Sequence, residues 1–150
     1  MNTWLFPLEK REFAAKRHLL IGLRSLHLTG VAGYAGFLVF DLPSDQWLYL
    51  ALLGLISGLL MFCIELWSDG IFLLQMRGLG VLLKLVIFAL ILIYPAWRFE
   101  GFFSIVLLAG YFSHCPAKVR YYLPFSRVNA SSSAKLRELQ RVRAAAITER

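Results

Sequence analysis

Charged residues are scarce in this sequence, and cysteines are scarcer still. Asp, Glu, Lys and Arg together make up 17% of the 150 residues, against about 25% in an ordinary soluble domain. The two cysteines, Cys63 and Cys115, have no C-x-x-C spacing and form no disulfide framework. These shortages exclude a soluble domain of usual composition and a small secreted domain held together by disulfides.

The signatures of the common enzyme classes are missing as well. The sequence contains no H-E-x-x-H, no G-x-S-x-G and no P-loop, and its apolar segments hold no pair of carboxylates at helical spacing. Asp41 and Asp45 are four residues apart, but they flank a proline in a polar turn and are expected to be solvated. No cleavable signal peptide precedes the first apolar run. We therefore expect a protein that is not an enzyme.

Long apolar runs are what the sequence has in abundance. Hydrophobic residues make up 59% of the chain, and a membrane-spanning helix needs about 20 of them in succession. Tryptophans Trp47 and Trp67 flank one run, where interfacial aromatic residues belong. The pattern predicts an all-α integral membrane four-helix bundle, residues 19–114, with spans at about 19–40, 47–67, 78–94 and 97–113.

The basic residues predict the orientation of these spans. Most Lys and Arg residues lie in a basic N-terminus, residues 1–18, and a basic tail, residues 115–150, whereas the connection after the first predicted span has none. The positive-inside rule places both termini in the cytoplasm, which requires an even number of spans. We expect a multi-pass protein of the bacterial inner membrane. The net charge of +7 is divided between the two ends, which argues against nucleic-acid binding.

A helix is predicted near the end of the basic tail. Residues 129–133 favour helix N-capping, and Leu136, Leu139, Val142 and Ala146 then fall on one side of an amphipathic helix. Such a helix could bind a partner or anionic lipid headgroups. The alternative is a short solvated tail.

Polar residues inside the apolar segments are the candidate functional residues, because a cation at the bilayer centre costs roughly 2.5–3.5 kcal/mol. Arg24 lies about 8 Å and His27 about 12 Å into the first span, and Lys84 about 9 Å into the third. Glu65 and His114 lie near the cytoplasmic ends of the second and fourth. We predict that these five line one ligand or cofactor pocket, and that Glu65 pairs with Arg24 or Lys84. In the alternative, the cations reach out to headgroups and His27 bonds a carbonyl of a neighbouring helix.

Three ligands fit the residues of this predicted pocket. His27 and His114 could be axial ligands to haem b, with Arg24 and Lys84 pairing its propionates. Copper favours imidazole and sulfur ligands, which makes His27, His114 and Cys115 candidate metal ligands. A quinone could use His27 and a neighbouring cation.

Small residues predict where helices pack closely. Ser25, Thr29, Gly33 and Gly36 form a stripe along the first predicted span, and the G-x-x-x-G of residues 54–58 offers a matching surface in the second. Small residues at such spacing let two membrane helices approach each other closely.

Two short segments resemble a known family. The segment RSLHLTG at residues 24–30 and the segment LLKL at residues 82–85 are similar to parts of the copper-resistance D-type membrane proteins and related small four-helix bacterial inner-membrane proteins. The resemblance implies metal handling by His27, with Lys84 as a structural companion.

The sequence thus favours an accessory or binding protein of the membrane, associated with a metal, haem or quinone. The alternatives are a transporter or channel component, and a scaffold subunit that packs onto other membrane subunits or onto further copies of itself.

Overall fold

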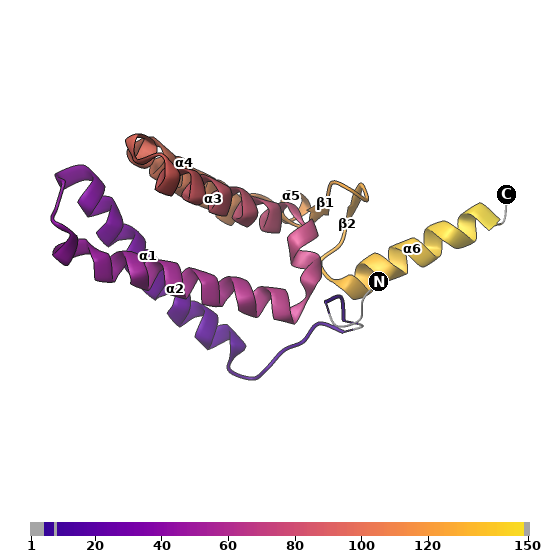
Figure 1. Ribbon diagram of the computed structural model, residues 1–150. Helices are drawn as coiled ribbons and strands as arrows, with labels where there is room; N and C mark the ends of the chain where they lie inside the picture. Colours follow the sequence, from indigo (N-terminus) through magenta and orange to yellow (C-terminus); the bar gives the residue numbers. More distant parts are fainter. Residues whose placement is uncertain (1–4, 8, 149–150) are drawn as a thin grey trace.

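The computed structural model describes residues 5–7 and 9–148, and it consists mainly of helices (Figure 1). The all-α prediction is confirmed. Four long helices come first: α1 (Lys16–Phe40), α2 (Ser44–Ser68), α3 (Met76–Ile93) and α4 (Arg98–His114). Short elements connect or follow them: η1 (Gly70–Leu74), η2 (Pro95–Trp97), α5 (Ala117–Arg120), β1 (Tyr122–Leu123) and β2 (Val128–Asn129). The tail helix α6 (Ser133–Thr148) comes last.

Helices α1 and α2 form an antiparallel hairpin. Asp41 ends α1 in the left-handed conformation, with φ of 49°, and Pro43 precedes α2. The two backbones meet where Gly30 faces Gly54, since a Cβ atom at Gly30 would collide with the backbone of Gly54. The hairpin is therefore packed as closely as two helices can be at this point.

The contact stripe on α1 differs from the predicted one. Gly33 packs against Leu50, as a small residue should. Ser25 and Thr29, however, are exposed and bond carbonyls of their own helix, and an added Cβ at Gly36 would meet nothing within 4 Å. The small residue that faces α2 most directly is Gly30, which the predicted stripe omitted.

Helices α3 and α4 form the second long hairpin, and aromatic rings join it to the first. The Tyr34 ring of α1 lies edge-on to Phe102 of α4, with 5.2 Å between centroids. Within the first hairpin, Phe37 of α1 stacks on Trp47 of α2 at 4.2 Å. The guanidinium of Arg98 lies 5.7 Å from the centre of the Phe37 ring. These contacts lie at the loop end of both hairpins, where α1 ends and α4 begins.

The opposite end of the hairpins carries a small buried core. Ile71 of η1 packs with Leu123, Ala130 and Leu136, all at most 3% exposed. Gly70, Ile71 and Phe72 of η1 are buried, and α6 and the β1–β2 hairpin cover Ile71. We call this end the junction. It comprises the N-terminal segment (residues 5–7 and 9–15), the first turns of α1, α3 and α6, the last turn of α2, and residues 69–75 and 117–132.

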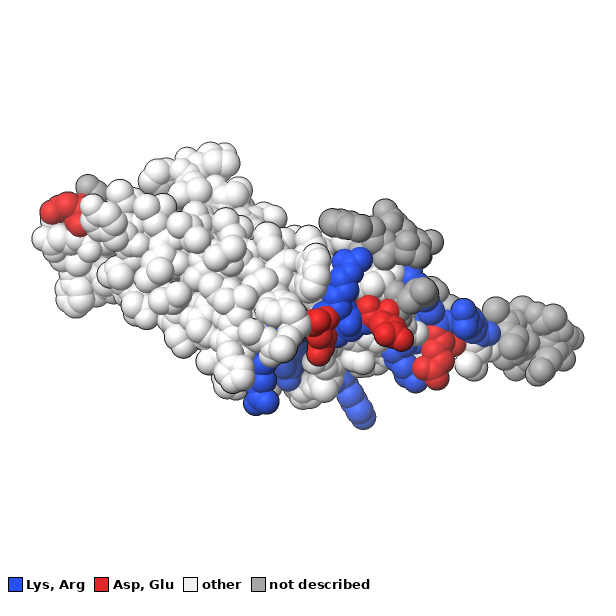
Figure 2. Space-filling model, turned by 90° about the horizontal axis from the view of Figure 1, so that it is seen from below, with Lys and Arg blue, Asp and Glu red and all other residues white. Residues whose placement is uncertain are grey.

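The surface of the hairpins is apolar, and charge gathers at the junction. Tyr49, Leu92 and Leu107 are 78%, 64% and 75% exposed. Figure 2 shows Lys and Arg side chains at the end from which α6 extends, while most of the long body is uncharged on this face. Two helical segments, Asp45–Ser68 and Met76–Ile93, are long and apolar enough to cross a membrane.

Candidate functional site

Among the described residues, no hydrogen bond or ion pair joins any two of the five residues predicted to line one pocket. Arg24 is exposed and Lys84 is half-buried, and neither has a hydrogen bond or ion pair within the described part of the chain. His114 is exposed at the last residue of α4.

His27 faces α2, where it is half-buried against two glycines. Its Nδ1 lies 2.7 Å from the carbonyl oxygen of Gly54, and a Cβ atom at Gly58 would come within 2.9 Å of the ring. A carbonyl oxygen only accepts, so Nδ1 donates and carries a hydrogen, which leaves Nε2 as the acceptor in the neutral ring. This hydrogen bond is the alternative given for His27 in the sequence analysis, a bond to a carbonyl of a neighbouring helix.

The residues predicted to bind a metal are dispersed. Among residues 5–7 and 9–148, no three His, Cys, Asp or Glu side chains lie close enough to hold a metal ion. Cys115 is buried, with its Sγ 3.5 Å from the carbonyl oxygen of Phe112. Cys63 is exposed on α2.

Glu65 has a partner that the sequence analysis did not predict. Its Oε2 lies 3.7 Å from Nη1 of Arg77, and both side chains are about three-quarters buried. The ion pair that Glu65 forms is with Arg77, the second residue of α3, and not with Arg24 or Lys84 as predicted. Arg77 also donates to Gln75 and lies over the rings of Phe72 and Tyr121, about 5.1 and 5.2 Å from their centres.

A buried carboxylate joins the end of α2 to the tail helix α6. Asp69 is 3% exposed, and its Oδ1 accepts from the backbone N–H of Ile71 at 3.1 Å. The same carboxylate accepts from the backbone N–H of Ser133 at 2.8 Å and from the Ser133 hydroxyl. Because Ser133 begins α6, Asp69 places a negative charge at the N-terminus of that helix, where it is stabilising. The buried Gln75 amide adds a 2.7 Å bond to the carbonyl oxygen of Ala130.

The N-terminal segment is hydrogen-bonded to the chain on either side of Asp69, at Ser68 and Gly70. The backbone N–H of Gly70 donates to the carbonyl oxygen of Leu5, and that of Arg11 to the carbonyl oxygen of Ser68, at 2.8 and 3.0 Å. The Ser68 hydroxyl donates to the carbonyl oxygen of Arg11 and accepts from Nζ of Lys16, both at 2.6 Å. Burial lowers the pKa of Lys16 from its ordinary value of 10.5, and Glu65 opposes that shift in part.

These contacts define the candidate functional site as a polar junction rather than an intramembrane pocket. Ser68 and Asp69 were not among the residues that the sequence analysis singled out. Ser133 was identified as a helix N-cap residue, but the carboxylate that caps α6 comes from a residue 64 positions away. The helix-capping residues 129–133 are the sequence signal that indicated this part of the molecule.

The chain matches no protein-family model, no curated protein and no solved structure.

Proposed function

We propose that this chain is a multi-pass scaffold protein of the bacterial inner membrane, which crosses the bilayer four times and keeps both termini in the cytoplasm. The first support is its exposed apolar surface. Soluble monomers rarely expose contiguous apolar patches of more than a few hundred Å². Here large apolar side chains are exposed on all four long helices, among them Leu28, Leu55, Val86 and Leu107, as lipid-facing side chains would be.

The packing of the helices supports four spans. Helix α1 runs antiparallel to α2, both have 25 residues and each is roughly 37 Å long. The N-terminal segment is bonded to the end of α2, and the chain that leaves α4 packs against η1. A bilayer that contains α2 and α3 therefore contains α1 and α4 too.

The distribution of charge supports the orientation. The junction carries Lys10, Arg11, Lys16 and Arg77, whereas the loop end has three acidic residues, Asp41, Asp45 and Glu100, and one basic residue, Arg98. Cytoplasmic loops carry the excess of Lys and Arg. The junction then lies at the cytoplasmic surface and the loop end outside.

The observation that carries the scaffold function is the attachment of α6 by Asp69. A helix fixed at one end by buried hydrogen bonds projects from the body in a set direction, as Figure 1 shows for α6. Its described outer residues include exposed Lys135, Arg141 and Val142, while Leu136 is buried in the junction core. This exposed surface suits the cytoplasmic part of another membrane subunit or anionic headgroups.

Native gel electrophoresis of gently solubilised membranes tests the scaffold function. We expect the wild-type chain to migrate in a complex larger than its monomer, and Val142→Asp on the exposed side of α6 to shrink that complex. Ser131→Ala, exposed just before α6, is the control and should change nothing. Migration of wild-type and Val142→Asp proteins as identical monomers would contradict the proposal.

A cofactor-associated membrane subunit is the second candidate, and the His27 hydrogen bond favours it. Histidines that bind metals usually donate their other ring N–H to a carbonyl or carboxylate, and the bond to Gly54 leaves Nε2 as the ligand-ready nitrogen. A visible spectrum and elemental analysis of the purified protein test this hypothesis. Haem b or copper that is present in the wild type and lost in His27→Ala would support it. A purified wild-type protein without haem or copper would contradict it.

A further inference from the structure

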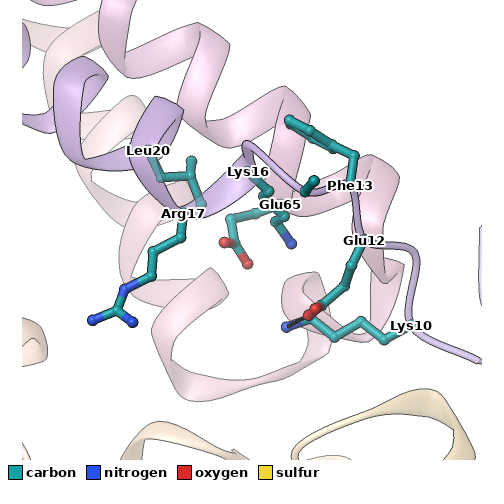
Figure 3. A pocket seen from close by; sticks show the side chains of 8 residues that line it. Lys10, Glu12, Phe13, Lys16, Arg17, Leu20 and Glu65 are labelled. Atoms are coloured by element: carbon teal, nitrogen blue, oxygen red, sulfur yellow. Dashed lines mark ion pairs between the residues drawn. The ribbon is translucent and has the colours of Figure 1, made fainter.

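A hollow of about 590 Å³ opens beside the first turn of α1, at the junction. Figure 3 shows its side chains, which come from the N-terminal segment, α1 and α2. Three cations line it, Lys10, Lys16 and Arg17, together with the two carboxylates of Glu12 and Glu65. Both signs of charge therefore face one space.

An apolar groove of about 330 Å³ adjoins the charged hollow. Phe13 lines both, and Leu60, Ile64 and Trp67 continue the groove along α2. Phe13 and Trp67 lie against each other, with ring centroids 6.2 Å apart. Phe13 is thus a wall common to a polar hollow and an apolar groove along α2.

Two of the charged side chains, Arg17 and Glu65, have hydrogen-bonding atoms available for a ligand. Arg17 is exposed and has no hydrogen bond or ion pair within the described part of the chain. Glu65 meets Arg77 through Oε2 at 3.7 Å, which leaves Oε1 available, and its carboxylate points into the hollow (Figure 3). A headgroup that carries both an anion and a cation would complement this pair.

We propose that the hollow and groove bind one phospholipid whose headgroup carries a phosphate and a primary ammonium. The phosphate lies by Arg17, the ammonium donates to Glu65, and an acyl chain follows Phe13 and Trp67 along α2. Charge-assisted hydrogen bonds of this kind are roughly twice as strong as hydrogen bonds between neutral groups. The site rests on the proposed membrane insertion, because insertion brings lipid to the end of α1.

Native mass spectrometry of the full chain, titrated with one lipid at a time, measures the binding. We expect phosphatidylethanolamine to bind about tenfold more tightly than phosphatidylcholine, whose quaternary ammonium has no N–H to donate. Arg17→Gln should weaken both lipids. Glu65→Gln should remove the preference between them.

Matched controls are available on the same chain. Arg24→Gln, exposed on α1 outside the hollow, and Glu138→Gln, exposed on α6, should bind as the wild type does. If Glu65→Gln fails to fold because Arg77 loses its partner, Phe13→Asp replaces it. Phe13 is 40% exposed, so the change is tolerable to the fold but should abolish binding.

Two results would overturn the lipid site. One is equal binding of all variants; the other is a preference for phosphatidylglycerol that Glu65→Gln leaves unchanged, which would indicate plain attraction to basic residues. A chain that inserts into membranes but fails these tests contradicts the lipid site alone. A chain absent from the membrane fraction contradicts the proposed function.

Discussion

Asp69 is a carboxylate removed from water and satisfied by three donors from two parts of the chain. Its hydrogen bonds hold the start of α6 against η1. A hydrogen bond to a charged group contributes about 1.5–3 kcal/mol, and its loss leaves buried donors unpaired. Asp69→Ala should therefore weaken the docking of α6 by on the order of 2–3 kcal/mol.

Hydrogen exchange of the α6 amides measures this docking. The three variants should rank in order, with Asp69→Ala most exchanged, Ser133→Ala intermediate and the exposed control Ser131→Ala unchanged. Ser133→Ala ranks between them because its backbone N–H still donates to Asp69. Equal protection of α6 in all three proteins would show that Asp69 does not hold the helix.

Lys16 provides a pH-dependent test at the same scale. Burial lowers its pKa below the ordinary value of 10.5, so the folded protein releases this proton at a lower pH than the unfolded chain does. Between the lowered pKa and 10.5 the unfolded state binds more protons, and stability rises with pH. The Tm of the wild type, relative to Lys16→Met, should therefore increase as the pH rises toward 10.5. A constant or falling difference would contradict the effect of burial on this lysine.

At the scale of elements, the α1–α2 hairpin depends on one close approach. A Cβ atom at Gly30 would collide with the backbone of Gly54 and come within 2.6 Å of the carbonyl oxygen of Leu50. Backbone cannot move aside as a side chain can, so the helices must separate. Gly30→Ala should destabilise the hairpin by about 1–3 kcal/mol.

Unfolding of the purified protein in detergent measures this cost. Gly22→Ala is the matched control on the same helix, because a Cβ atom there meets nothing within 4 Å. It should leave stability unchanged or slightly raised, since alanine is the better helix former. A Gly30→Ala protein as stable as Gly22→Ala would mean that the two backbones are not in contact.

The long helices and the tail helix could be predicted from the sequence, because each depends on a local pattern. Apolar runs bounded by Pro43, Asp69 and Pro95 mark the helices, and the serines at 131–133 mark the start of α6. The junction could not be predicted in this way. Asp69 meets Ser133, and Gln75 meets Ala130, across more than fifty residues, and no local pattern records such a pair.

At the scale of the whole molecule, the candidate site lies at the junction and not in the pocket predicted from the five residues that the sequence grouped. Arg24, His27, Lys84 and His114 were grouped because topology gives them similar depths. Equal depth does not fix the face of a helix, and the structure leaves Arg24 and His114 exposed while His27 bonds α2. Glu65 lines a hollow with other charged groups at the junction. Its partner Arg77 was missed because it lies at the start of α3, just before the apolar run.

The central claim is that the four long helices cross the bilayer together, with the junction in the cytoplasm. Topology reporters placed at both chain ends, at Ser44 and at Ala96 test it most directly. The account predicts cytoplasmic signals from both ends and external signals from Ser44 and Ala96. A cytoplasmic signal from Ala96, or an external one from the C-terminus, would contradict it.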